Sequence, residues 1–339
     1  RFSAQSNTRM SDATIYDVAK LANVSISTVS RVLNTPEQVN EATRLRVLAA
    51  IDSLQFVPKA EASARARKST RRIGVLAPFI TYPSFVQRLR GVAAQSGAVY
   101  EVVIYNVEST VRRDSYLSTL PVLRRLDGLI VMALPFDDTV AQRLRANKLE
   151  TVLIECVHPA FSSVEINDRL GGALVAEYLL AQGHRRYGFV GDATVPDFAV
   201  HTSARRLEGY QRAVRAGGGE LAPEHICLGP HGLETARQLA HQMLSTPAPP
   251  TAIFAPSDTQ AMGVLKAARE RGLAVPRDVA VIGFDDVDIA SYIGLTTVRQ
   301  PLEESGRVAV ELLQGHLAGQ SRLAQRVTLP LEIVRRETA

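Results

Sequence analysis

The sequence predicts an all-helical N-terminal unit followed by a larger α/β region, which contains two parallel sheets with helices on both faces. Residues 14–33 hold apolar side chains at helical spacing, with a capping residue before each run. From residue 73 onward, candidate strands alternate with amphipathic helices, and this alternation favours parallel sheets. Together with a length of 339 residues, these patterns indicate roughly two or three folding units.

Two short helices are predicted between Thr14 and Leu33. Thr14 is suited to cap the first helix, with Asp17 completing a capping box, and its apolar face is Val18, Ala19 and Leu21. Asn23 tolerates the left-handed conformation of a turn. Ser25 is suited to cap the second helix, whose inward face is Val29, Val32 and Leu33 and whose outward face is Ile26, Ser27, Ser30 and Arg31. Small polar groups and one arginine suit a DNA major groove, so the pair is interpreted as a helix-turn-helix; the alternative is a helical hairpin with no DNA role.

A third helix and a linker follow. Asn40 is suited to begin a helix over Glu41–Leu54, whose inward face is Val47, Leu48, Ile51 and Leu54, and Pro58 ends it. Residues 59–72 have too little apolar surface to fold alone, but they are rich in residues that favour helix. They are therefore predicted to be a linker that becomes helical on a partner.

The α/β region begins at Ile73. The expected strands are Ile73–Ala77, Val99–Asn106, Gly128–Ala133, Thr151–Ile154, Ser163–Ile166, Tyr187–Gly191, Ala252–Ala255 and Val279–Phe284. The expected helices between them include Phe85–Gln95, Leu170–Gln182, Leu207–Ala216, Leu233–Leu244 and Thr259–Arg271. Ligands of such folds bind beyond the carboxyl ends of the strands, so a ligand is expected there, in a cleft between two lobes.

Composition narrows the class of protein. The chain is 46% hydrophobic, yet it has no apolar run of transmembrane length and no signal peptide, so no membrane partner is expected. Cys156 and Cys227 lack metal-ligand spacing and are expected to be reduced thiols in a cytoplasmic protein. Residues 1–72 hold 12 Lys and Arg against 6 Asp and Glu, whereas the remainder holds 27 against 28. A basic headpiece on a neutral body indicates a polyanionic partner for the headpiece alone.

The stretch Thr14–Asn34, TIYDVAKLANVSISTVSRVLN, resembles the headpiece of the lactose-repressor/galactose-repressor (LacI/GalR) family. The resemblance covers nearly the whole chain, through Phe56-Val57-Pro58, Ile73-Gly74-Val75, Leu126–Ile130, Gly183–Arg186, Val281–Asp286, Thr296–Pro301 and Leu329–Thr338. It implies two similar lobes, like those of periplasmic sugar-binding proteins, with three crossings of the chain between them.

The resemblance also implies the division of the chain. The expected parts are a disordered extension over 1–13, a helix-turn-helix headpiece over 14–58, a basic hinge over 59–72 and a two-lobed effector-binding and dimerisation domain over 73–339. Lobe one is expected to comprise about residues 73–165 and 300–327, and lobe two about residues 166–299 and 328–339.

The resemblance implies base-reading positions on the second helix, occupied here by Ile26, Ser27 and Arg31. Arg can grip guanine with two hydrogen bonds, Ile can touch a thymine methyl group, and Ser is permissive. Phosphate contacts or helix caps are expected from Thr14, Ser25, Thr28 and Ser30. Arg65 and Arg67 in the basic hinge are also expected to contact DNA, against the alternative of a merely solvated linker.

Arg65 departs from the family pattern. The family commonly places a Leu seven residues after the hinge proline, where the Leu pair of a dimer wedges into the minor groove and kinks it. Arg65 stands at that position here, with no Leu nearby. The departure puts the wedge in doubt, though not DNA binding itself.

The resemblance implies an effector pocket. Asp285 and Arg206 match ligand-binding positions, and Ser257-Asp258, Glu155, Tyr82 and Phe85 are further candidates. Planar bidentate groups with an aromatic platform suit a sugar ring. Two structural alternatives remain open: Asp258 caps the helix over residues 259–271, and Arg206 pairs with Asp192 or Asp197.

The sequence contains no G-x-S-x-G, H-E-x-x-H or Walker motif, and an enzyme, a cofactor or a metal site is not expected. The interpretation is a homodimeric repressor of carbohydrate-utilisation genes, which binds a palindromic operator and a sugar-like effector. The alternatives are a sugar-binding receptor without a DNA function, or a regulator that responds to a nucleobase, a sugar phosphate or a protein co-regulator.

Overall fold

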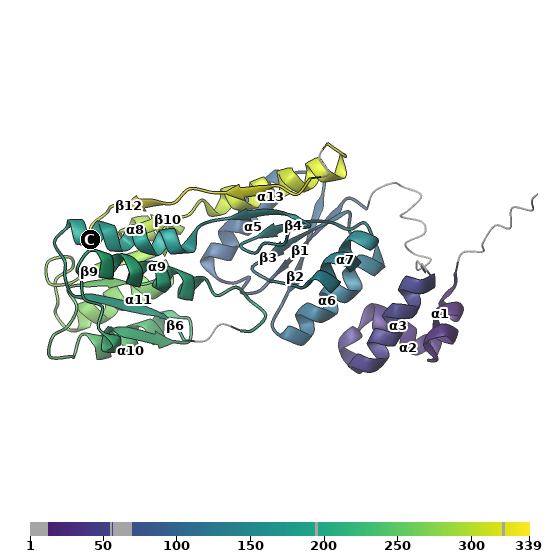
Figure 1. Cartoon of the computed structure of the whole chain (residues 1–339), viewed down its shortest axis with the longest axis horizontal. Coiled ribbons are helices and arrows are strands. Elements are labelled where there is room, and N and C mark those ends of the chain that lie inside the picture. Colours follow the sequence, from purple (N-terminus) through teal and green to yellow (C-terminus); the bar gives the residue numbers. More distant parts are fainter. Residues whose placement is uncertain (1–12, 55, 57–69, 194–195, 321–322) are drawn as a thin grey trace, which may run out of the picture. The chain divides into compact units, whose positions relative to one another are not determined.

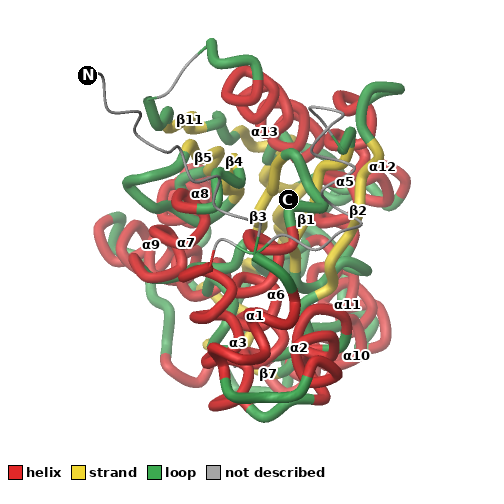
Figure 2. The backbone as a smooth tube through the Cα atoms, turned by 90° about the vertical axis from the view of Figure 1, so that its right-hand side faces the viewer, coloured by secondary structure: helices red, strands yellow, loops and turns green. Residues whose placement is uncertain are grey.

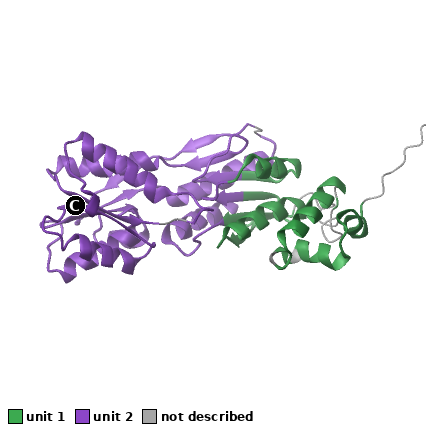
Figure 3. Ribbon diagram, turned by 60° about the horizontal axis from the view of Figure 1, so that its bottom comes forward, with its two compact units in different colours: residues 1–76, 98–129, 136–151 green, residues 77–97, 130–135, 152–339 purple. Residues whose placement is uncertain are grey.

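The computed structural model describes residues 13–54, 56, 70–193, 196–320 and 323–339 (Figure 1). The predictions for Pro58, Arg65, Arg67 and the linker over 59–69 lie outside these residues. Two compact units are present, one of residues 1–76, 98–129 and 136–151 and the other of residues 77–97, 130–135 and 152–339 (Figure 3). Among the described residues, no helix is both long and apolar enough to cross a membrane.

The headpiece contains the three predicted helices, α1 (Ile15–Ala22), α2 (Ile26–Asn34) and α3 (Glu41–Leu54), with a short 3-10 turn at Pro36–Gln38. The predicted capping box is confirmed: the Thr14 backbone N donates to Asp17 Oδ2 over 2.8 Å, and the Asp17 backbone N donates to Thr14 Oγ1 over 3.4 Å. Asn23 is left-handed, as predicted, with φ 52° and ψ 54°.

The second helix begins where predicted. The Thr28 backbone N donates to Ser25 Oγ over 3.2 Å. A buried apolar core joins the three helices through Val18, Ala22, Val29, Val32, Val47, Leu48 and Ile51. The prediction for Leu21 was wrong, because this side chain is 54% exposed and Ala22 occupies the core instead. Leu21 projects about 110° away from the centre of the buried stripe at the 100° helical repeat.

The first sheet of the α/β region has the strand order β11-β5-β4-β3-β1-β2. Its strands are β1 (Arg72–Ala77), β2 (Glu101–Asn106), β3 (Gly128–Met132), β4 (Glu150–Ile154), β5 (Ser162–Glu165) and β11 (Arg326–Thr328). The associated helices are α5 (Pro83–Ser96), α6 (Thr110–Leu123), α7 (Asp138–Ala146) and α13 (Leu302–Leu317). The five longer strands match predicted segments; α6 contains Pro121, a residue that usually interrupts a helix.

The second sheet has the order β12-β10-β9-β8-β6-β7. Its strands are β6 (Tyr187–Asp192), β7 (Ile226–Gly229), β8 (Ala252–Phe254), β9 (Ala280–Asp285), β10 (Thr297–Arg299) and β12 (Glu332–Val334). The helices are α8 (Asp168–Ala181), α9 (Thr202–Ala216), α10 (Leu233–Met243), α11 (Asp258–Glu270) and α12 (Asp288–Tyr292), and a 3-10 turn lies at Pro223–His225. In Figure 2 helices are red and strands yellow.

One feature of this sheet differs from the expected parallel arrangement. Strand β10 pairs in parallel with β9 but antiparallel with β12, so the second sheet is mixed. A three-residue edge strand can pair in either direction, because it needs no crossover helix to reach its neighbour. The core on one side of the sheet is aromatic, with Tyr187, Phe189, Tyr210, Phe254 and Phe284 all fully buried.

Two helix pairs pack at backbone contact. A Cβ atom on Gly209 of α9 would lie 1.9 Å from the carbonyl oxygen of Arg169 in α8. A Cβ atom on Gly306 of α13 would lie 2.2 Å from the carbonyl oxygen of Arg88 in α5. Only glycine permits such approaches, and the position of each helix against its neighbour is therefore fixed.

Candidate functional site

Helix α2 presents polar residues on the face opposite its core. Ile26 is 40% exposed, and Ser27 and Arg31 are also exposed, whereas Val29 and Val32 are fully buried. The Ser25 hydroxyl lies 2.8 Å from both the Ser27 and the Thr28 hydroxyl. The three predicted base-reading side chains thus share one accessible face, and two of the hydroxyls expected to cap a helix or contact phosphates, those of Ser25 and Thr28, lie together at its N-terminus.

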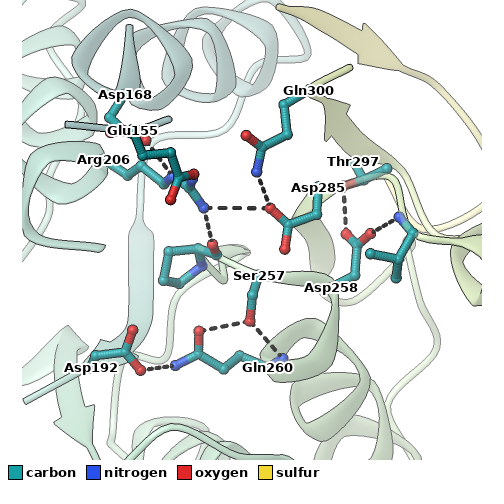
Figure 4. A network of polar contacts seen from close by, with 12 residues as sticks. Glu155, Asp168, Asp192, Arg206, Ser257, Asp258, Gln260, Asp285, Thr297 and Gln300 are labelled. Carbon is teal, nitrogen blue, oxygen red and sulfur yellow. Dashed lines mark hydrogen bonds and ion pairs between the residues drawn. The ribbon is translucent and has the colours of Figure 1, made fainter. Parts of the chain in front are cut away.

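A second group of predicted residues surrounds Arg206, which is 4% exposed on α9 (Figure 4). Its Nε donates to Asp168 Oδ1 over 2.9 Å, and its Nη1 donates to the carbonyl oxygen of Pro256 over 2.6 Å. The same Nη1 lies 3.7 Å from Asp285 Oδ1. The alternative that Arg206 pairs with Asp192 or Asp197 was wrong, because Asp168 at the start of α8 faces it directly.

The charges of this group depend on burial. Burial raises the pKa of Asp285 to about 6, against the lowering effects of Arg206, Gln300 and Arg88. Burial also raises the pKa of Asp168, and Arg206 lowers it. Burial alone would lower the pKa of Arg206, but Asp168 and Asp285 raise it above its ordinary value. Arg206 therefore stays cationic.

Gln300, which directly follows β10, continues the contacts beyond Asp285. Its Nε2 donates to Asp285 Oδ1, and its Oε1 accepts from Arg88 Nη2 over 3.1 Å. The same Nη2 forms an ion pair with Glu155, which follows β4 in the left-handed region at φ 62°. A continuous series of polar contacts thus joins the predicted residues Arg206, Asp285 and Glu155.

Ser257 and Asp258 are held by the fold. The Gln260 backbone N donates to Ser257 Oγ over 3.2 Å, so Ser257 caps α11 and the alternative that Asp258 caps it was wrong. Asp258 has no exposed surface; its Oδ2 accepts from the Val287 backbone N over 2.8 Å, and its Oδ1 accepts from Thr297 Oγ1. Burial raises its pKa well above the ordinary value. Asp258 therefore anchors the segments that follow β9, and each of its oxygens already accepts a hydrogen bond from the fold.

Aromatic rings lie beside the predicted Tyr82. The Phe79 and Tyr82 rings stack at 5.0 Å between centroids, and the Tyr82 and His231 rings stack at 4.5 Å. His231 Nδ1 lies 3.2 Å from Asp192 Oδ1. The predicted Phe85 is buried, with its ring centroid 6.0 Å from that of Phe79. The predicted aromatic platform is thus part of a larger aromatic cluster.

Comparison with known proteins identifies the family. Residues 14–59 match bacterial regulatory proteins of the lacI family, and residues 176–339 match a periplasmic binding protein-like domain. The HTH-type transcriptional repressor CytR of Escherichia coli (strain K12) is 34% identical over 328 residues, which cover 91% of each chain. The chain belongs to the LacI family.

Other LacI-family proteins match at similar length. The ribose operon repressor of Escherichia coli (strain K12) is 33% identical over 335 residues, covering 96% of this chain and 100% of that protein. The solved lac repressor dimer bound to operator and the anti-inducer ONPF is 27% identical, with a TM-score of 0.68, covering 97% of this chain and 99% of that chain. This LacI-family chain is a DNA-binding, ligand-responsive transcriptional repressor, and its relatives are regulators, not enzymes.

The LacI-family site also contains residues that sequence reasoning missed: Arg88, Asp168, His231, Gln260 and Gln300. Gln300 stood inside the quoted motif Thr296–Pro301, and Asp168 closely followed a predicted strand, so both carried a signal. Arg88 gave none, because one arginine in an amphipathic helix is ordinarily solvated. Gln260 fixes Asp192, donating from Nε2 to Oδ1 over 3.0 Å.

Proposed function

We propose that this repressor binds a sugar-like effector through Asp285 and Arg206. Effector binding would then control the affinity of the homodimer for a palindromic operator. The observation that carries the proposal is the position of Arg206 Nη1 3.7 Å from Asp285 Oδ1, both buried where β9 ends. A carboxylate accepts hydrogen bonds from ligand hydroxyls, and a guanidinium donates to their oxygens, so adjacent hydroxyls are matched in pairs. The stacked rings of Phe79, Tyr82 and His231 offer a flat surface for a sugar ring.

On the DNA side, we propose that Arg31 reads guanine in the major groove and that Ile26 and Ser27 contact neighbouring bases. Thr14, Ser25, Thr28 and Ser30 are proposed to contact phosphates, together with Arg65 and Arg67 of the hinge. The exposure of Ile26, Ser27 and Arg31 on one face of α2 supports this assignment.

We propose that the effector acts by selecting one orientation of the lobes. Residues 73–165 with 300–327 would form one lobe, and residues 166–299 with 328–339 the other. A ligand bound in the cleft between the lobes favours the closed state by its difference in affinity for the two states. The lobe orientation then sets whether the two hinges of a dimer can order together on DNA. We place this activity in the cytoplasm, at the nucleoid when operator is bound.

The test has two arms. Gel-shift titration of the full-length protein on genomic fragments around its own gene should identify an inverted repeat as the operator. Operator release is then followed with D-ribose, cellobiose, adenosine, adenine and ribose 5-phosphate. The operator complex of Asp285→Ala should not be released by the effector. The operator complex of Asp114→Asn, a variant that alters an exposed ion pair with Arg113, should be released as in the wild type.

A protein that fails to shift any fragment would favour the alternative of a receptor without a DNA function. Unchanged effector midpoints in Asp285→Ala would place the effector elsewhere in the molecule.

A further inference from the structure

Arg88 is a buried cation with an unfilled donor. It lies on α5 and is 3% exposed. Its Nη2 contacts Glu155 and Gln300, but its Nε has no hydrogen-bond partner among the described residues. An N–H of a charged group that is buried without a partner is costly, and it therefore marks a position where a ligand atom or water is expected.

The surroundings of Arg88 form a narrow cavity. Its wall is polar where Arg88, Glu155, Glu165, Gln300 and Ser305 line it, and apolar at Ile154 and Val164. The α5 backbone is fixed there, because the Arg88 carbonyl oxygen packs against Gly306. Arg88 therefore cannot leave the site by a shift of its helix.

The buried charges in the series of contacts that includes Arg88 are unequal. Two guanidinium groups, Arg88 and Arg206, face three carboxyl groups, Glu155, Asp168 and Asp285, in one series of contacts. Arg88 is already neutralised by Glu155, and Arg206 by Asp168. A ligand anion placed here would find no unpaired cation. Its charge would also be less well solvated than in water, so its burial would be unfavourable.

We propose that Arg88 and Glu155 form a second polar anchor, which selects an uncharged, hydroxyl-bearing effector and rejects its phosphorylated form. The proposal rests on the function proposed above, because Asp285 and Arg206 hold the other end of the ligand. A hydroxyl group is both donor and acceptor, so a single one can accept from Arg88 Nε and donate to Glu155. A phosphate group has only acceptors to offer near neutral pH and would face the carboxylates of Glu155 and Glu165, which line the cavity.

The test uses calorimetry on the full-length protein with two matched pairs of probes. These are D-ribose with ribose 5-phosphate, and adenosine with adenosine 5′-monophosphate. For whichever pair the wild type binds, the uncharged probe should bind at least about tenfold more tightly than its phosphorylated partner, a difference of about 1.4 kcal/mol. Equal or tighter binding of the phosphorylated member would overturn the proposal.

Two variants shift the discrimination in opposite directions. Glu155→Gln leaves Arg88 as an unpaired cation and should narrow the preference for the uncharged probe by at least about tenfold. Arg88→Gln leaves Glu155 unpaired and should widen the preference by a similar factor. Glu208→Gln, which removes one carboxylate from an exposed ion pair with Arg169, should leave the preference unchanged. Thermal unfolding of each variant confirms that it is folded. Either variant alone shows in which direction the preference for the uncharged probe changes.

The outcomes separate the two proposals. An Asp285→Ala variant that binds with unchanged affinity contradicts the proposed function, and so does a wild type that binds none of the four probes and is released from operator by none of the compounds named above. Binding that depends on Asp285 but keeps the same preference in Glu155→Gln and Arg88→Gln leaves that function standing. It would show that the Arg88–Glu155 pair is only structural.

Discussion

The Arg206 guanidinium carbon lies 3.7 Å from the centroid of the Phe284 ring. Phe284 is fully buried in β9, and the next residue is Asp285. One strand therefore supplies both the ring beneath the cation and the carboxylate beside it. Because packing and Asp168 already fix Arg206, little side-chain freedom is lost when a ligand binds, and this preorganisation favours affinity.

Effector affinity is expected to fall below pH 6. The pKa of Asp285 is raised to about 6, and ligand hydroxyls donate to its ionised form. A proton on Asp285 competes with the ligand, so affinity should drop by up to about tenfold per pH unit below 6. Calorimetry at pH 5, 6 and 7 with the sugar that binds best measures this. Asp285→Asn should bind weakly at every pH, and a wild type with a flat profile would contradict the prediction.

The same shift affects stability in a defined direction. Because the pKa of Asp285 is higher in the folded state than its ordinary value of 3.8, the folded protein binds this proton more tightly. Its contribution to stability is fully present below about pH 4 and is lost as the pH rises through 6, a change of about 3 kcal/mol. Urea unfolding at pH 5 and pH 7 should show a smaller pH dependence in Asp285→Asn than in the wild type. An equal dependence in both proteins would argue against the shift.

Arg206→Ala is expected to lower the free energy of unfolding by about 3–5 kcal/mol. The substitution leaves Asp168 and Asp285 buried without their cation, and the Pro256 carbonyl loses a donor. Arg169→Ala, which breaks an exposed pair with Glu208, should change stability by less than about 1 kcal/mol. Denaturant titration of both variants makes the comparison. Similar small losses in the two variants would show that the buried pair is not required for stability.

Arg31→Ala should weaken binding to the cognate operator by about 1–3 kcal/mol and have little effect on random DNA. Arg67→Ala should weaken binding to both DNAs about equally and flatten the salt dependence, because a phosphate contact carries no sequence information. Titrations of both variants with cognate and random DNA at several salt concentrations test these two expectations. An equal loss on both DNAs for Arg31→Ala would remove its base-reading role.

The operator centre is expected to bend less sharply than one wedged open by leucine. An arginine at position 65 can enter a narrow A·T minor groove without unstacking bases. Circular-permutation bending assays should show a larger bend for Arg65→Leu than for the wild type. A sharp bend in the wild type that Arg65→Leu does not increase would contradict this.

The sequence predicted most of the fold because its signals were local. The caps Thr14 and Ser25 and the left-handed Asn23 depend on neighbours within a few residues, and the structure confirmed all three. The short strands β7, β10 and β11 were not predicted, because their few residues show no clear periodic pattern. Their pairing is decided by residues far away in the chain.

The candidate site was predictable in part for the same reason. Asp285 follows a clear strand and was found from its position. The partner of Arg206 was not, since Asp168 lies 38 residues away and only the packing of α8 on α9 brings the two together. Asp258 looked like a ligand-binding group in the sequence, but the hydrogen bonds that occupy both oxygens depend on Val287 and Thr297, which are remote in sequence.

The contacts of Gly209 and Gly306 constrain how such a protein can acquire a new effector. Any larger residue at either position would push a helix outward and displace Arg206 or Arg88 with it. New specificity must therefore arise by exchanging side chains at positions such as 82, 88 and 155, while the helices that carry or face them stay in register. The α8–α9 pair of the second sheet and the α5–α13 pair of the first sheet therefore hold the backbone of the site fixed, and changes of specificity are confined to the side chains that line it.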